Sequence, residues 1–350
     1  WLKRLLGSDQ AAPATARSAL ARSRRSGSNP PRRGPARPAA KRHDSGRARA
    51  PMDGRLLSKL DQVHSFLWKD LDERSETYSC TVPGFQGRVA VKVFGSTTQR
   101  GSETAQVLKD LDHPNLIRLL HVLSLSPLCL VLELCQGGSL HTLLHEASST
   151  SASEFSVDQR LRAVAQAVSG VAYLHGKDIV HSAVRPNNIF LSRPVSRGPE
   201  GIIMPQVILG DLGLARFLAP EDNESSLSLG ILRYTAPEVI LRASHEPLSD
   251  VYSCSVMMHE VLTASLPFSD LNIPSHILVL KVCAGLRPDL DSLRACGAAN
   301  PQVVSIIVSA WEEDLHSRTT SEELEQSLFE LIDLRQQSSL EVGPALPGDR

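Results

Sequence analysis

The regular structure that the sequence favours changes from strand to helix near residue 134. Before that point, four segments rich in β-branched or apolar residues are bounded by Gly, Pro or Ser and are predicted to be strands, at about 78–82, 88–94, 116–124 and 129–134. Behind it, Val157–His175 and Ser321–Leu334 have apolar residues at helical spacing, and Asp250–Thr263 is apolar on nearly all sides. Strands followed by helices predict an α+β fold with a small β-rich lobe and a larger helical lobe.

The two ends of the chain differ from this folded part in composition. Residues 1–50 carry a net charge of +11, although the whole chain carries only −1. Their Ala, Arg, Pro and Ser cannot bury enough apolar surface to fold. We expect a disordered basic tail over 1–52, a folded domain over about 70–335 and a disordered tail over 336–350. The basic tail could be solvated, contact acidic surfaces or membrane, or act as a transit peptide.

The spacing of the cysteines and the hydropathy of the chain indicate the cellular compartment in which the protein works. The six cysteines form no Cys-x-x-Cys pair and no metal-ligand spacing, which is typical of a reducing compartment. The longest apolar run, Leu119–Cys135, contains His121, Pro127 and Glu133, and therefore fits a strand, a turn and a second strand better than a membrane span. We expect a cytoplasmic protein without a membrane span or a nucleic-acid partner.

Several short motifs follow one another in a fixed order across residues ~70–335. They are Val89–Lys92, His113–Ile117, Leu130–Leu140, His181–Asn188, Asp211–Gly213, Ala236–Glu238 and Ser249–Ser253, with Arg318 behind them. Together these motifs resemble the eukaryotic protein kinase domain, and in particular its tyrosine-kinase-like branch. The resemblance implies the bilobal kinase fold, with an N-lobe over ~70–134 and a C-lobe over ~136–335.

The resemblance also implies a nucleotide site. Lys92 would contact the α- and β-phosphates of ATP, and Glu133 and Cys135 would lie in the hinge between the lobes. Asn188 and Asp211 match the two residues that hold magnesium in the family. ATP and Mg²⁺ are therefore the implied cofactors.

The general base of the family is missing from this loop. Where the family has His-Arg-Asp, this chain has His181, Ser and Ala183, and a methyl group can neither accept a proton nor orient a hydroxyl. Arg185 replaces the catalytic-loop Lys, and Ile231 replaces a Thr that would hydrogen-bond the missing Asp. Because a hydroxyl without its acceptor is costly, the paired change indicates an accommodated loss. No catalytic residue is predicted to be intact.

Nucleotide binding is predicted to be weak or absent. The segment Leu71–Cys80 stands where the family has its Gly-rich loop, but it has no glycine and several carboxylates. A carboxylate about 4 Å from a phosphate costs on the order of 1–4 kcal/mol. The segment Glu103–Leu111 is predicted to be the helix that carries, in the family, a Glu paired with the phosphate-binding lysine. The position of that Glu falls on Thr104 in this chain, and Glu103 lies about 100° away around the helix.

The positions that maintain the fold are retained. Glu238 and Arg318 would form a buried ion pair, and Asp250 would hydrogen-bond the backbone near His181. The residues predicted to be structural are His181, Leu212, Gly213, Glu238, Asp250 and Arg318. The segment Ser192–Pro205, rich in Gly, Pro and Arg, is predicted to be a mobile insert.

Retained scaffold and lost chemistry together predict a pseudokinase that acts on other proteins as a signalling scaffold or allosteric regulator. The first alternative is a residual Ser/Thr protein kinase that transfers the γ-phosphate of ATP to protein hydroxyls. The second is a small-molecule phosphotransferase, which the pairing of Ala236–Glu238 with Arg318 disfavours because that pair organises a protein-substrate platform.

Overall fold

The chain divides into two units, Trp1–Met52 and Asp53–Arg350, and the description below concerns the second. The computed structural model describes residues 60, 62–69, 75–94, 101–125, 128–146, 155–199, 201–211, 229–242, 245–298 and 300–341. The expected basic tail over 1–52 lies outside these residues, as do the acidic segment 71–74 and the predicted structural residues Leu212 and Gly213.

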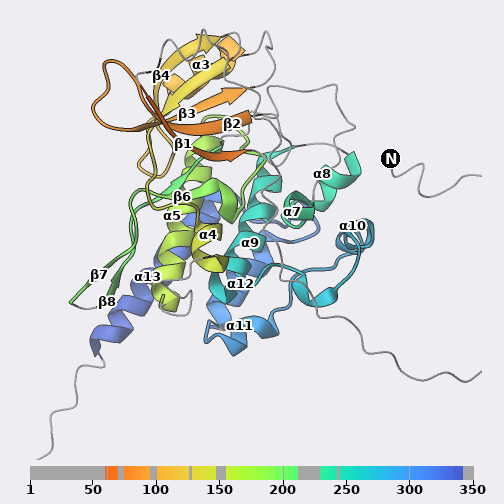
Figure 1. Ribbon diagram of the computed structural model, residues 1–350. Coiled ribbons are helices and arrows are strands. Elements are labelled where there is room, and N and C mark those ends of the chain that lie inside the picture. The colour runs from red at the N-terminus through yellow and green to blue at the C-terminus, as the bar shows by residue number, and fades with distance from the viewer. Residues whose placement is uncertain are drawn as a thin grey trace, which may run out of the picture. The chain divides into compact units, whose positions relative to one another are not determined.

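A five-stranded antiparallel sheet forms the N-terminal part of this unit (Figure 1). Its strands are β1 (Gln62–Lys69), β2 (Ser75–Thr81), β3 (Val89–Phe94), β4 (Leu119–Leu125) and β5 (Leu128–Leu132), in the spatial order β1-β2-β3-β5-β4. Helix α3 (Gly101–Lys109) lies between β3 and β4 in the chain. The sheet and the helices that follow it confirm the α+β bilobal fold that the sequence predicted.

Strand β1 lies ahead of the domain boundary that the sequence placed near residue 70. It pairs with β2 along its whole length, with irregular register between Val63 and Ser65 and between Phe66 and Trp68. These irregularities interrupt the alternation of polar and apolar residues by which a strand is recognised. Gly84 and Gly87, both with positive φ, lie in the turn between β2 and β3.

The C-terminal part is mainly helical, and its short strands carry the residues of interest. Its longer helices are α5 (Val157–His175), α9 (Pro247–Thr263), α10 (Ser275–Cys283), α12 (Pro301–Ala310) and α13 (Ser321–Glu341). The shorter elements are α4 (Leu140–His145), η2 (Pro186–Asn188), β6 (Ile189–Leu191), β7 (Ser196–Gly198), β8 (Gly201–Ile203), β9 (Val207–Leu209), α7 (Leu229–Leu232), α8 (Pro237–Arg242), η3 (Ser269–Leu271) and α11 (Asp291–Ala295).

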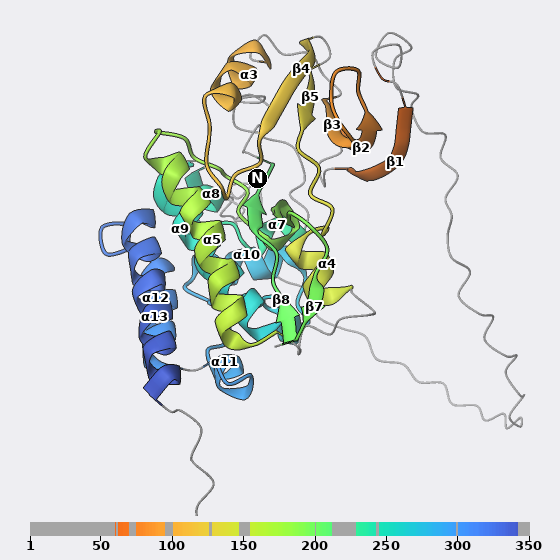
Figure 2. The same cartoon turned by 90° about the vertical axis from the view of Figure 1, so that its left-hand side faces the viewer.

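Helices α5 and α9 pack side by side at the centre of this lobe (Figure 2). Helix α5 begins at a capping box in which Ser156 and Gln159 satisfy each other's backbone N–H groups. Helix α9 is buried at every position from Ser249 to Leu262, as expected for a segment that is apolar on nearly all sides. This rigid pair supports the loops that lie between it and the sheet.

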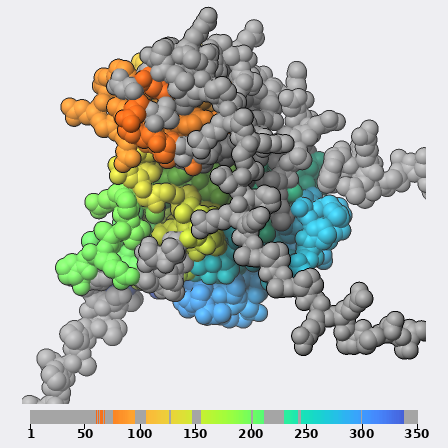
Figure 3. Space-filling model, viewed as in Figure 1, coloured from red at the N-terminus to blue at the C-terminus, as the bar shows by residue number. Residues whose placement is uncertain are grey.

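Two segments contain regular structure that the sequence analysis did not predict. Within the expected mobile insert Ser192–Pro205, strands β7 and β8 pair as an antiparallel hairpin, which lies at the surface in Figure 3 (green). Helix α13 continues to Glu341, past the expected boundary near residue 335, and it packs along α5. No helix among the described residues is long and apolar enough to cross a membrane.

Candidate functional site: the cleft between the sheet and the helical lobe

The loop that precedes β6 is hydrogen-bonded to a side chain of helix α9. The backbone N–H groups of His181 and Ser182 donate to the two carboxylate oxygens of Asp250, at 2.6 and 2.8 Å. Asp250 is almost completely buried, and His175 on α5 lies 3.1 Å from it. Ser182 has a φ of 65°, a left-handed conformation that these hydrogen bonds stabilise. The loop conformation is therefore fixed by the scaffold and needs no ligand.

His181 is a positioning residue in this arrangement. Its ring is fully buried, its Nε2 donates to the carbonyl of Gly210 at 3.0 Å, and its Nδ1 accepts from the N–H of Ala183 at 3.2 Å. These contacts assign the neutral tautomer with its proton on Nε2. Burial lowers the pKa of His181, although the charge of Asp250 opposes this shift. A neutral imidazole with both nitrogens engaged has no free site for a substrate proton.

Ala183 occupies the expected position of the general base, and the surrounding contacts are intact. The side-chain amide of Asn188 donates to the carbonyl of Ala183 at 2.8 Å, and the N–H of Gly210 donates to the carbonyl of Asn188 at 2.8 Å. The strands β6 and β9 that flank these residues pair antiparallel. The loop thus presents a methyl group where the family motif presents a carboxylate.

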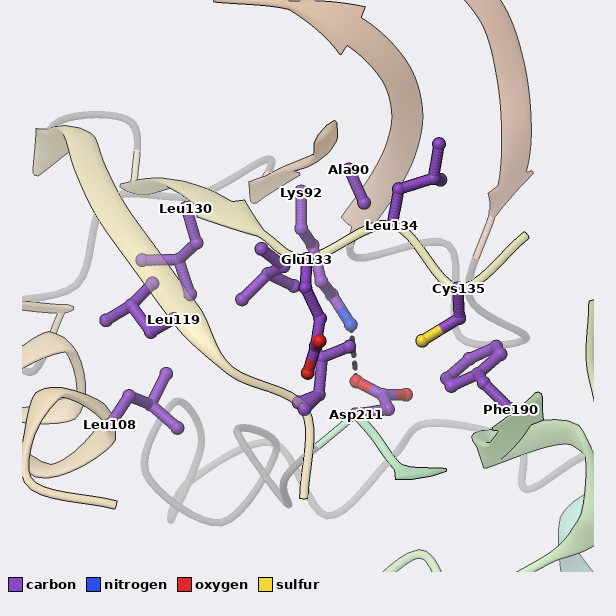
Figure 4. Close-up of a pocket in the computed structure, with 12 residues that line it drawn as sticks. Ala90, Lys92, Leu108, Leu119, Leu130, Glu133, Leu134, Cys135, Phe190 and Asp211 are labelled. Atoms are coloured by element: carbon purple, nitrogen blue, oxygen red, sulfur yellow. Dashed lines mark hydrogen bonds and ion pairs between the residues drawn. The ribbon is translucent and has the colours of Figure 1, made fainter. Parts of the chain in front are cut away.

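Lys92 on β3 and Asp211 after β9 form an ion pair across the cleft (Figure 4). Lys92 is buried, and its ammonium group lies 5.3 Å from the ring centroid of Phe94. Burial alone would raise the pKa of Asp211, but the charge and the hydrogen bond of Lys92, helped by the charge of Arg185, hold the pKa below its usual value. Asp211 is therefore an ionised carboxylate. It lies near Asn188, because the N–H of the preceding residue, Gly210, donates to the Asn188 carbonyl.

The two hinge residues differ in their surroundings. The Glu133 carboxylate accepts the backbone N–H of Arg118 at 2.8 Å, and the Glu133 N–H donates to the Arg118 carbonyl at 3.1 Å. Cys135 lies beside Phe190 in Figure 4. Burial, helped by the charge of Glu133, raises the pKa of the Cys135 thiol to about 12. The side chain of Glu133 is thus hydrogen-bonded within the protein, and that of Cys135 is largely buried.

Phe190 fills the floor of the cleft, a feature that the sequence analysis missed. Its ring packs so closely on Gly210 that a Cβ there would lie 2.6 Å from the ring. The cavity that Phe190 lines with Lys92, Cys135 and Asp211 has a volume of about 40 Å³. Pockets that take drug-sized ligands have about 300–1,000 Å³. The inner cavity by itself is therefore too small for a purine.

A larger cavity of about 520 Å³ lies on the outer side of Phe190. Leu67, His141, Arg185 and Asn188 contribute to its lining. Arg185 is buried, and its Nε and Nη1 atoms have no hydrogen-bond partner among the described residues. Arg185 thus lines the outer cavity at the position where the family has its catalytic-loop lysine.

Glu238 and Arg318 form the bidentate ion pair that the sequence predicted, at 2.7 and 3.4 Å. Arg318 also donates to the carbonyls of Leu248 and Glu312, at 2.9 Å each. Burial alone would raise the pKa of Glu238, but the hydrogen bond and charge of Arg318 hold it below its usual value. The pair anchors α8 to the loop before α13.

Two expected features cannot be placed. Leu212 and Gly213 lie outside the described residues, and so do the side chains of Glu103 and Thr104 on α3. The structure does bring together Lys92, Asn188 and Asp211, which come from three separate stretches of the chain.

Comparison with known proteins gives the family. Residues 76–328 match the family of protein tyrosine and serine/threonine kinases. The chain is 27% identical to a probable serine/threonine-protein kinase of Dictyostelium discoideum, over 67% of this chain and 17% of the relative. It is 30% identical to the RAF proto-oncogene serine/threonine-protein kinase of Xenopus laevis, over 63% of this chain and 34% of the relative. It is also 30% identical to human serine/threonine-protein kinase A-Raf, over 63% of this chain and 36% of the relative. The chain thus spans about a third or less of the length of these relatives. On its matched residues and its fold, it belongs to the protein tyrosine and serine/threonine kinase family.

Proposed function

We propose that this chain is a catalytically impaired protein kinase domain that acts as a signalling scaffold or allosteric regulator of other proteins. One observation carries the proposal: Ala183 stands at the base position of a loop whose remaining contacts, to Asp250 and Asn188, are all in place. Because the scaffold is complete, no rearrangement of this loop is needed to explain the loss.

The size of the effect follows from the chemistry of the missing group. General-base assistance is worth about 10²–10⁴-fold in rate. A protein kinase typically turns over at about 1–100 s⁻¹. Phosphate transfer by this chain should therefore be slower than that of a typical kinase by a similar factor.

Weak or absent nucleotide binding is part of the proposal. An amide oxygen of Asn188 and the carboxylate of Asp211 are hard ligands that suit Mg²⁺, which would neutralise phosphate charge when bound. Two observations support weak binding: the inner cavity that Phe190 helps to line has only about 40 Å³, and Lys92 is engaged with Asp211. A nucleotide that contacts Lys92 would compete with this ion pair, although the adjoining cavity of about 520 Å³, lined by Cys135 and Asn188, is large enough for a ligand of this size.

The alternative is a residual serine/threonine protein kinase, the activity that the names of the Raf relatives state. Lys92, Asn188 and Asp211 lie together in the cleft, and the buried Arg185 could contact a phosphate. Electrostatic stabilisation by these groups could leave measurable transfer without the base.

The test is transfer of radiolabelled phosphate from ATP by the full chain with Mg²⁺ or Mn²⁺, against Asp211→Asn as control. A parallel thermal melt with and without nucleotide reports binding. We expect no transfer above the control and little or no shift in the melting temperature. Transfer that disappears in Asp211→Asn would overturn the proposal in favour of the residual kinase.

A further inference from the structure

A second cluster of ionisable side chains lies between α4 and α9, away from Lys92 and Asp211. His141 and His145 are four residues apart on α4, and so their rings project from the same face of the helix. The ring centroids are 4.8 Å apart with an interplanar angle of 51°. Both rings face Glu260, which lies on the neighbouring helix α9.

Glu260 is a completely buried carboxylate whose two oxygens have different neighbours. One oxygen lies 2.8 Å from Nε2 of His145 and 3.7 Å from Nδ1 of His141. The other accepts the hydroxyl of Tyr234. Burial alone would raise the pKa of Glu260, but His141, His145 and Tyr234 together hold it below its usual value. The group is therefore an anion in the interior of the protein, with nitrogen atoms on one side.

The three groups have the geometry of a metal site. Their ligand atoms all lie within 4.8 Å of one another. In a tetrahedral zinc site with bonds of about 2.0–2.1 Å, ligand atoms are about 3.3 Å apart. The two nitrogen-to-oxygen distances, 2.8 and 3.7 Å, bracket that value. Shifts of less than an ångström would place both nitrogens and the carboxylate oxygen around one ion.

His141 supplies a second, independent observation. Its Nδ1 atom is buried and has no hydrogen-bond partner in the described part of the chain. At 3.7 Å from Glu260, it is too far for a hydrogen bond to that oxygen. A buried nitrogen without a partner costs free energy, and a cation between it and the carboxylate would remove that cost.

One outer contact orients the carboxylate. The hydroxyl of Tyr234 donates to the second oxygen of Glu260. Nε2 of His141 lies 3.9 Å from a carboxylate oxygen of Glu146, too far for a hydrogen bond, so Glu146 would have to move closer to become the outer partner that metal-bound histidines commonly have.

An ion can also reach the cluster. His141 and Glu146 line the outer cavity of about 520 Å³, together with Thr142 of the same helix. This cavity gives an entry path and room for a water molecule as a fourth ligand. Two imidazoles and one carboxylate suit zinc and similar transition metals better than Mg²⁺ or Ca²⁺, which prefer oxygen ligands.

We propose that His141, His145 and Glu260 bind one zinc ion. The ion joins α4 to α9, and through Tyr234 it also fixes the residues that lead into α8. This site is separate from the Asn188 and Asp211 pair, and its existence does not depend on whether the domain transfers phosphate.

The test measures zinc binding to the full chain by competition with a chromophoric chelator, with Mg²⁺ in excess to occupy hard-cation sites. The variants are His141→Ala and His145→Gln, and the latter keeps an N–H that can donate to Glu260. The matched control is His276→Ala, which removes an exposed histidine on α10. Losing an outer partner alone typically weakens metal affinity about 10–100-fold. Each site variant should therefore weaken the tightest zinc binding by at least about tenfold, and the control should leave it unchanged.

The melting temperature provides a second readout. Zinc should raise it for the parent chain and for His276→Ala, and much less for the two site variants, because a ligand that binds only the folded state stabilises that state. Circular dichroism checks that the variants are folded. Equal zinc affinity in all four proteins, or no zinc-dependent stabilisation of the parent chain, would overturn the proposal.

Discussion

Buried polar groups have different surroundings in the helical lobe and in the cleft between the helical lobe and the sheet. In the lobe, Asp250 accepts two backbone N–H groups, and Arg318 meets a carboxylate and two carbonyls. In the cleft, Arg185 has buried N–H groups without partners among the described residues, and Ala183 replaces a carboxylate. The groups that maintain the fold are satisfied within the protein. Of the groups in the cleft, Lys92 and Asp211 satisfy each other, whereas two N–H groups of Arg185 have no partner within the described residues.

Restoring the base should produce the largest effect. The contacts of Asp250 and Asn188 already fix the loop, so Ala183→Asp, combined with Ile231→Thr, should place a carboxylate in position. We expect phosphate transfer to rise from the background of the parent chain to a measurable rate, because general-base assistance is worth about 10²–10⁴-fold. The matched control is Ala183→Asn, which has the same shape but cannot accept the proton. Equal rates for the two variants would show that the base is not what limits this domain.

Breaking the anchor below should cost stability and leave the cleft unchanged. Arg318→Met leaves the buried carboxylate of Glu238 without its counter-ion, and such losses typically cost about 3–5 kcal/mol of unfolding free energy. Denaturant unfolding measures this value. Arg294→Met is the control, because its ion pair with Asp291 is largely exposed and should contribute less than about 1 kcal/mol. Similar losses in both variants would contradict a special role for the Arg318 anchor.

Reopening the inner cleft should have a smaller effect. Phe190→Leu removes aromatic bulk from the floor of the 40 Å³ cavity. Leucine fills less of the cavity floor than phenylalanine, and a gain of about 1 kcal/mol in binding free energy would raise nucleotide affinity about fivefold. Fluorescent-nucleotide titration measures it, and Phe329→Leu on the exposed face of α13 serves as control. If affinity stays the same, Phe190 does not exclude the nucleotide.

The sequence was sufficient where structure depends on near neighbours. Lys92 and Asp211 belong to motifs of three or four consecutive residues, and the structure brings them together as the resemblance implied. It was insufficient where geometry breaks the local pattern. Strand β1 has two register irregularities, and α13 continues beyond the last strongly apolar turn.

Long-range contacts between residues outside the recognised motifs could not be predicted, for a different reason. His145 and Glu260 are 115 residues apart, and neither lies in a local metal-binding pattern that includes the other. Phe190 looks like an ordinary strand residue until the fold places its ring against Gly210. A glycine before Asp211 is compatible with many neighbours, and so it gives no signal that a ring fills the cleft.

Acid should weaken the anchor with a predictable sign. The pKa of Glu238 is lower in the folded protein than its usual value, so the folded state binds this proton less readily than the unfolded state. Its contribution to stability is then complete above the unfolded glutamate pKa of about 4.3 and is lost as the pH falls through the lower, folded pKa.

The stability difference between the parent chain and Arg318→Met, measured by denaturant unfolding across this range, should shrink in acid. Glu238→Gln, which cannot titrate, should show a constant difference from its own Arg318→Met double variant. A difference for the parent chain that stays constant in acid would mean that the bonds from Arg318 to the carbonyls of Leu248 and Glu312, and not the ion pair, hold the anchor together.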